Sequence, residues 1–220
     1  RIPKISSAKL RNMPVPLPRF AERAAIVGAL GDLDGAVDAI GNLVRKKREL
    51  KKAVMQQLLT GKMRLPGFSG EWSVSRIDRL AAIGTGSRNT QDRVPDGEFP
   101  FYVRSQRVER IDSFAHEGEA VLTAGDGVGT GKVFHYVNGR YDLHQRVYRI
   151  HDFSEDLDGK YFFYQFSNRF YGRIMSMTAK SSVDSVRREM IAGMKIPLPC
   201  RAEQEAIAAV ISDVEREIDA

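Results

Sequence analysis

A segment near the start of the chain is repeated at its end, and this repeat limits the folds that the sequence can adopt. Residues 13–39 align without a gap with residues 194–220, and 11 of the 27 aligned positions are identical. Each copy contains a Pro-Leu-Pro sequence, which favours an extended segment because proline fixes φ and disfavours the helical region in its predecessor. One long-period repeat around an unrelated middle indicates a duplicated unit. A solenoid would need at least three short repeats.

A long helix is predicted after the first Pro-Leu-Pro sequence. Apolar residues recur there at spacings of three and four, which is typical of a coiled-coil seam, and no proline interrupts residues 22–60. A helix of this length would extend roughly 58 Å at 1.5 Å per residue. It needs a partner helix to cover its seam, so we expect self-association as an antiparallel two-fold dimer. The expected helix-partner interface consists of Ile26, Leu30, Leu33, Val37, Ile40, Leu50, Val54 and Leu58.

The second copy of the repeat predicts another, shorter helix. Its apolar stripe consists of Ile207, Val210 or Ile211, Val214 and Ile218. The sequence stops within this stripe at Ala220, and it starts at Arg1 instead of a methionine. We therefore expect the sequence to be a fragment of a longer protein.

The middle of the chain predicts a separate globular domain over residues 72–190, after a turn-rich linker at 65–72. Aromatic and β-branched runs predict strands at 99–103, 120–122, 133–137 and 147–150. Asn138-Gly139 is the preferred sequence of a type I′ turn and predicts a hairpin there. The aromatic run 161–170 predicts a buried helix. The expected fold class is α+β: a mixed α/β domain, a long coiled-coil-type helix and a second, truncated helix.

Charge and composition narrow the classes of protein. The 220 residues carry a net charge of +6, which permits nucleic-acid binding without proving it. No apolar run approaches the roughly 20 residues of a membrane span. The single cysteine, Cys200, excludes an internal disulfide and fits a reducing compartment. We expect a cytoplasmic protein that does not associate with membranes.

The glycine-rich segment 125–132 does not match a nucleotide-binding motif. A phosphate loop would need a glycine where Asp126 stands and Ser or Thr where Val133 stands. The dinucleotide fingerprint would need a glycine at Lys132. A glycine turn between two strands is favoured, and a nucleotide-binding enzyme is the weaker alternative. The four histidines are not at ligand spacing, so we expect no metal, no cofactor and no catalytic residue.

Polar and basic clusters in the middle domain are more informative. They lie at 88–93, 104–107, 142–146 and 180–188, and they are rich in the side chains that contact base edges and phosphates. One such cluster is more often a solvated loop, but four in a small domain favour DNA binding. The predicted DNA-binding residues are Thr90, Arg104, Ser105, Arg107, Lys132, His144, Gln145, Arg146, Lys180, Ser181 and Ser182.

Several strings of the sequence together resemble the specificity subunit of type I restriction–modification systems. These strings are MPVPLP (13–18), KKAVMQQLLTGK (51–62), LPGFSGEW (65–72), GDGVGTGK (125–132), HQR (144–146), SSVDSVRR (181–188) and IPLP (196–199). The resemblance covers essentially the whole chain. It implies four parts: the tail of a preceding recognition domain (1–18), a conserved long helix (19–62), a target-recognition domain (63–190) and the start of a second conserved helical region (191–220).

The resemblance also implies a function. The recognition domain would read one half of a bipartite DNA site, and the long helices would act as a ruler and dock the methyltransferase subunits. Methylation and cleavage would belong to the methyltransferase and restriction subunits, so the chain itself would be non-catalytic. The alternative from a different class is a coiled-coil adaptor without DNA specificity.

Overall fold

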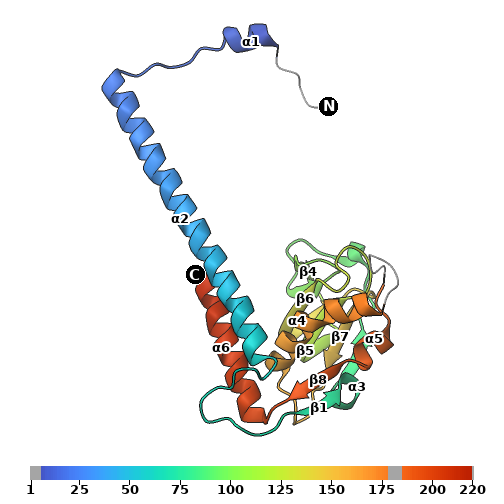
Figure 1. Ribbon diagram of the computed structural model, residues 1–220. Helices are drawn as coiled ribbons and strands as arrows, with labels where there is room; N and C mark the ends of the chain where they lie inside the picture. The colour runs from blue at the N-terminus through green and yellow to red at the C-terminus, as the bar shows by residue number, and fades with distance from the viewer. Residues whose placement is uncertain (1–5, 178–184, 220) are drawn as a thin grey trace. The chain divides into compact units, whose positions relative to one another are not determined.

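The computed structural model describes residues 6–177 and 185–219, and the chain divides into two units, Arg1–Glu49 and Leu50–Ala220. Figure 1 shows the elements of both units, which we describe separately. The fold class is α+β, as predicted, because helices accompany a mixed sheet.

In the first unit, α1 (Ser7–Arg11) is followed by an extended stretch and by most of the long helix α2 (Phe20–Leu58). The prediction of an uninterrupted long helix is confirmed. The side chains of its predicted seam in this unit are exposed, with relative exposures from 44% at Ile26 to 62% at Ile40. Among the described residues of this unit, none covers the seam, and a single helix cannot bury its own apolar stripe.

The last residues of α2 belong to the second unit, and there the predicted seam has a different role. Leu50 is still exposed, but Val54 packs against the core and Leu58 is almost completely buried within it. Leu58 therefore contacts the core of its own unit instead of an external helix.

The second unit is built around a six-stranded sheet in the order β2-β7-β5-β6-β3-β4. Neighbouring strands are antiparallel except β3 and β6, which are parallel. The strands are β2 (Ala82–Thr85), β3 (Phe99–Tyr102), β4 (Glu109–Ile111), β5 (His116–Ala124), β6 (Phe134–Leu143) and β7 (Val147–His151). The four strands predicted from aromatic and β-branched runs are all present.

The predicted hairpin turn at Asn138-Gly139 is wrong. Both residues lie inside β6, opposite Glu119 and Gly118 of β5. The two strands share a ladder of eight residue pairs, and this ladder outweighs the local turn preference of two residues. The turn of the hairpin is instead the glycine-rich segment 125–133.

The glycines paired across β5 and β6 mark a bend. Tyr141 of β6 lies opposite the first residue of β5, whereas Val147, which begins β7, lies opposite Ala124 at the other end of β5. Eight residues of strand span about 26 Å, but the six residues from 141 to 147 reach at most about 22 Å. The paired strands β5 and β6 must therefore curve, so that Tyr141 and Val147 come close enough for this connection. Gly118 and Gly139 permit this with φ values of +101° and +135°, which favour glycine.

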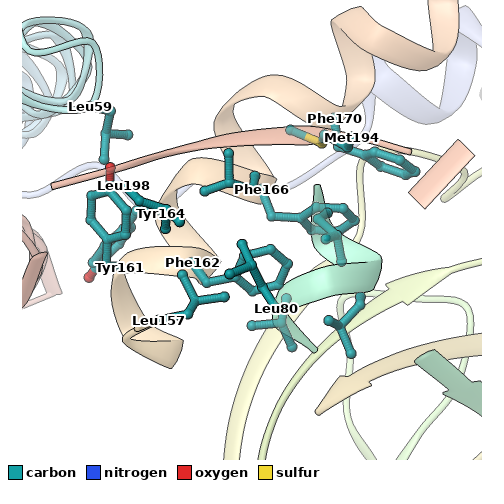
Figure 2. Packing of buried hydrophobic residues seen from close by; sticks show 14 of the residues in the cluster. Leu59, Leu80, Leu157, Tyr161, Phe162, Tyr164, Phe166, Phe170, Met194 and Leu198 are labelled. Atoms are coloured by element: carbon teal, nitrogen blue, oxygen red, sulfur yellow. The ribbon is translucent and has the colours of Figure 1, made fainter. Parts of the chain in front are cut away.

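Helix α4 (Gly159–Ser176) covers one face of the sheet, and the prediction of a buried aromatic helix is confirmed. Figure 2 shows Phe162, Phe166 and Phe170 in a row along this helix, and their successive ring centroids are 5.4 and 4.4 Å apart. The helix begins where the Asp158 carboxylate accepts a hydrogen bond from the Tyr161 amide at 2.7 Å, a typical N-cap. These rings form the centre of the main core.

The second copy of the repeat forms the last two elements of this unit. Its β8 (Lys195–Leu198) pairs antiparallel with β1 (Ser73–Arg76), and α6 (Arg201–Asp219) follows. The predicted stripe of α6 faces the core, with Ile207 and Ile211 buried. The remaining short elements are α3 (Ile77–Leu80), η1 (Thr90–Asp92) and α5 (Arg188–Ala192).

Candidate DNA interface

Two of the predicted loop clusters meet at Asp126, in the segment between β5 and β6. Its Oδ1 accepts a hydrogen bond from Arg104 Nη1 at 2.9 Å, and its Oδ2 lies 3.7 Å from Arg146 Nε. The side chains of Arg104 and Arg146 remain 42% and 65% exposed. One carboxylate therefore holds two arginines side by side, and both guanidinium groups keep donors free for a ligand.

A second contact joins the loop after β6 to the segment before η1. Gln145 Nε2 donates to Asn89 Oδ1 at 2.6 Å, and the Gln145 amide donates to the Arg88 carbonyl at 2.8 Å. Thr90 follows directly as the first residue of η1 and is exposed. Gln145 and Thr90 thus lie on one polar surface with Arg146.

His144 is buried, with 5% of its surface exposed. Its Nδ1 accepts a hydrogen bond from the Arg146 amide at 2.9 Å, and its own amide donates to the Tyr102 carbonyl at 3.0 Å. Burial lowers the pKa of the imidazole below its ordinary value of 6.5, and the nearby Arg104 charge lowers it further. The side chain therefore supports the loop that presents Gln145 and Arg146.

The remaining predicted residues border this surface. Arg107 is highly exposed beside Glu109, and the Ser105 hydroxyl donates to the Arg107 carbonyl at 2.9 Å. Lys132 is exposed, and its Nζ lies 5.4 Å from the centre of the Tyr171 ring. Lys180, Ser181 and Ser182 lie outside the described residues.

The glycine-rich segment is a tight turn packed against its neighbours. A Cβ atom at Gly129 would lie 2.7 Å from the Arg104 carbonyl oxygen, and one at Gly131 would lie 2.4 Å from Ile174. Both glycines are therefore needed for close packing, as expected for a turn between two strands.

The sequence indicated the polar loops but not the residues that organise them. In the sequence, Asp126 is only the wrong residue for a phosphate loop, and Asn89 is one member of a polar cluster. Neither position has a sequence signal of its own, because each acts through a partner that is 20 or more residues away along the chain. Within the described residues, no group of three or more histidine, cysteine or acidic side chains is placed to hold a metal ion. None of the described helices combines the length and apolar character needed to span a membrane.

Around Asp126, neighbouring loops bring together Arg104, Arg146, Gln145 and Thr90, and we call this polar and basic region the Asp126-centred surface. The comparison with protein families shows to which class of binding protein the chain belongs. The family described as the type I restriction modification DNA specificity domain matches residues 69–220. The chain therefore belongs to the type I restriction–modification DNA specificity family, whose role is DNA sequence recognition. The expectation of a non-catalytic chain agrees with this membership.

Individual relatives agree with the family. The chain is 26% identical over 141 residues to the EcoDI specificity subunit of Escherichia coli, which covers 63% of this chain and 30% of that protein. It is 21% identical over 254 residues to the MjaVIII specificity subunit of Methanocaldococcus jannaschii, which covers 99% of this chain and 59% of that protein. The chain thus spans less than two thirds of the curated relatives that it matches.

Solved structures show the same fold. The S subunit of a type I restriction–modification system from M. genitalium superposes with a TM-score of 0.75 at 13% identity, over 98% of this chain and 60% of that one. The HsdS subunit from Thermoanaerobacter tengcongensis superposes with a TM-score of 0.56 at 16% identity, over 99% and 56%.

Proposed function

We propose that this chain reads one half of a bipartite DNA site as part of a type I specificity subunit, and that the Asp126-centred surface contacts the DNA. The observation that supports this most directly is the pairing of Arg104 and Arg146 on one carboxylate, next to Gln145. Glutamine can bond both edge atoms of adenine, and arginine can bond both acceptors of guanine, each bidentate pair discriminating by about 1–3 kcal/mol. Gln145 and Arg146 are therefore the proposed base readers.

The other residues have supporting roles in this proposal. Arg104, Arg107 and Lys132 contact phosphates, which position the protein without carrying sequence information. Thr90 and Ser105 add hydroxyl donors at the edge of the surface. Lys180, Ser181 and Ser182 stay proposed DNA contacts on the basis of the sequence, because they lie outside the described residues.

The helices have a separate proposed role. Residues 19–62 form the spacer of the subunit and residues 191–220 the start of a second conserved helical region, on either side of a recognition domain at 63–190. Residues 1–18 are the end of a preceding recognition domain. The helices dock methyltransferase subunits and, through them, the restriction subunits, and the long helix pairs with another helix, as a homodimer when this chain is alone. A DNA ligand of this kind places the protein in the cytoplasm.

The test is a binding selection on random duplex DNA, using the complete subunit with its methyltransferase partner. We expect enrichment of one bipartite sequence. Arg146→Ala and Gln145→Ala should each relax the preference at a single base position, with Arg107→Ala as a control that weakens binding evenly. An even loss of binding in all three variants would contradict the assignment of base readers. No enrichment with the unaltered protein would favour the adaptor alternative.

A further inference from the structure

A basic pocket opens beside the C-terminal half of α4, outside the Asp126-centred surface. Its volume is about 450 Å³, and its lining includes Arg169, Gly172, Arg173, Ser176, Gly193 and Lys195. The first four residues lie at spacings of three and four along α4, so they share one side of that helix. The other two come from the turn after α5 and from the start of β8, next to α4 in the fold (Figure 1).

The cations of this pocket form no ion pair within the described part of the chain. Among the described residues, no carboxylate forms an ion pair with Arg169, Arg173 or Lys195, and the only side-chain partner of Arg169 is the Gln165 amide oxygen at 3.4 Å. By contrast, Arg104 and Arg107 of the Asp126-centred surface each have a carboxylate neighbour. The pocket therefore brings together three cationic side chains that form no ion pair with a described carboxylate, and such a concave basic site attracts an anion.

One cation of the pocket is held in place. Arg173 Nε donates to the Met190 carbonyl at 2.9 Å, and Arg173 Nη2 lies 3.2 Å from the position that a Cβ of Gly193 would occupy. The absence of a side chain at Gly193 thus leaves room for the guanidinium. A fixed guanidinium with free N–H groups is well suited to a phosphate oxygen, because little rotamer freedom is lost on binding.

The pocket and the Lys132–Tyr171 contact lie on the same turn of α4 but on different sides of it, because adjacent residues of a helix point about 100° apart. Tyr171, whose ring contacts Lys132, immediately precedes Gly172 in the helix. Gly131 also packs against this turn, because a Cβ there would lie 3.2 Å from Tyr171. A helix with its side chains is only about 10–12 Å across, so a polyanion that contacts Lys132 is long enough to reach the pocket on the other side of this turn, whereas a small anion is not.

We propose that this pocket binds a phosphate group of the duplex DNA backbone, outside the bases read by the Asp126-centred surface. This inference rests on the proposed function and adds a site to it. The pocket contacts the backbone only, so it strengthens binding and fixes the orientation of the domain on the duplex without selecting any base.

Gly172 offers a test that leaves the existing side chains intact. A Cβ at this position would meet nothing within 4 Å, so Gly172→Glu places a carboxylate beside the arginines without a clash. Gly172→Ala is the matched control, and it should preserve the fold because alanine favours a helix interior more than glycine does. Lys195→Ala, at an exposed strand position, removes a cation instead of adding an anion.

The measurement is the affinity of the complete subunit, with its methyltransferase partner, for its target duplex over a series of salt concentrations. Loss of one phosphate contact should flatten the plot of log affinity against log salt by about 0.9. We expect this flattening and weaker binding for Gly172→Glu and Lys195→Ala, with an unchanged base preference. Gly172→Ala should match the unaltered protein.

The alternatives have distinct outcomes. If the unaltered complex binds its target and both charge variants bind it equally well with the same slope, the pocket proposal is wrong and the proposed function stands. If both variants keep DNA affinity but no longer associate with the methyltransferase subunit, the pocket binds an acidic protein segment and the phosphate proposal is also wrong. If the unaltered complex binds no DNA sequence selectively, the proposed function itself fails.

Discussion

The two copies of the repeat have closely similar sequences but very different surroundings. Leu17 and Ile26 in the first copy are 76% and 44% exposed, whereas their counterparts Leu198 and Ile207 are 9% and 1% exposed. The second copy forms a strand paired with β1 and a helix that lies on the core. In the first copy the stretch after α1 has no strand partner among the described residues.

The acidic residue shared by the copies shows the same difference. Glu203 is buried and accepts hydrogen bonds from both Arg64 Nε and Nη2, at 2.6 and 2.7 Å, and from Trp72 Nε1 at 3.2 Å. Its counterpart Glu22 is exposed. The repeat therefore encodes a face that can be covered. In the second copy this face is covered by the segment 64–76, by α4 and by the end of α2.

The largest expected effect concerns the first copy of the repeat, whose apolar side chains are exposed. We expect the chain to self-associate through the seam of α2, because burial of this apolar stripe is the main free-energy gain available to it. Leu33→Glu combined with Ile40→Glu should raise the dissociation constant at least about a hundredfold, since two charges would be buried in the pairing. Light scattering should show a dimer mass that falls to the monomer mass in this variant.

The control for that experiment lies on the same helix outside the seam. Ala39→Glu combined with Asn42→Glu adds the same charge but should leave the dimer intact. A monomer at tens of micromolar for the unaltered chain, or equal dissociation in both double variants, would contradict pairing through this seam.

The next prediction compares the loss of stability caused by substituting each of the two matched isoleucines of the repeat. Ile207→Ala should lower the free energy of unfolding of residues 50–220 by about 2–5 kcal/mol, because it leaves a cavity in the core. Ile26→Ala should change it by less than about 0.5 kcal/mol, as for an exposed position. Urea unfolding followed by the fluorescence of Trp72, the only tryptophan, measures both at concentrations where the chain is monomeric. Equal losses would show that the first copy is covered within the monomer.

The two glutamates should differ in the same direction by a smaller amount. Glu203→Ala should cost about 2–3 kcal/mol, because it leaves the Trp72 indole and the partly buried Arg64 without their acceptor. Arg64 can still reach water, which keeps the cost below that of a fully buried pair. Glu22→Ala should be close to neutral in the same unfolding assay. A neutral result for Glu203→Ala would mean that the ion pair does not stabilise the junction between residues 64–72 and α6.

The smallest expected effect is a pH dependence confined to the second unit. All four histidines lie between residues 116 and 151, and burial lowers the pKa values of His116, His135 and His144. A lowered pKa in the folded state means that the unfolded chain binds more protons, so stability is complete above about pH 6.5 and falls as the pH drops below it. Thermal unfolding followed by near-ultraviolet circular dichroism should show a lower midpoint at pH 5.5 than at pH 7.5.

A matched variant isolates one of these groups. His144→Gln removes the titration of the buried ring, so its midpoint should depend less on pH over the same range. A midpoint that is constant between pH 7.5 and 5.5 in the unaltered protein would contradict the inferred pKa direction.

Local patterns were enough to predict much of the fold. The apolar spacing and the lack of proline predict α2, and the aromatic run at 161–170 predicts α4. Both predictions succeed because helical periodicity is a property of residues that are close together in the sequence. Aromatic and β-branched runs located four strands. The repeat and the strings around it also indicated the family and, through it, DNA recognition.

Only the tertiary structure decided which of these patterns are covered and which polar groups meet. Asn138-Gly139 became part of a bend because eight cross-strand pairs outweigh one turn preference. His144 became a buried support, and Asp126 became the partner of two arginines, because each is set by residues distant in the chain. A sequence specifies local conformational preferences directly, but contacts between residues far apart in the sequence exist only after the chain has folded. The two copies of the repeat therefore differ in burial because, among the described residues, the second copy packs on a core within its own unit and the first copy does not.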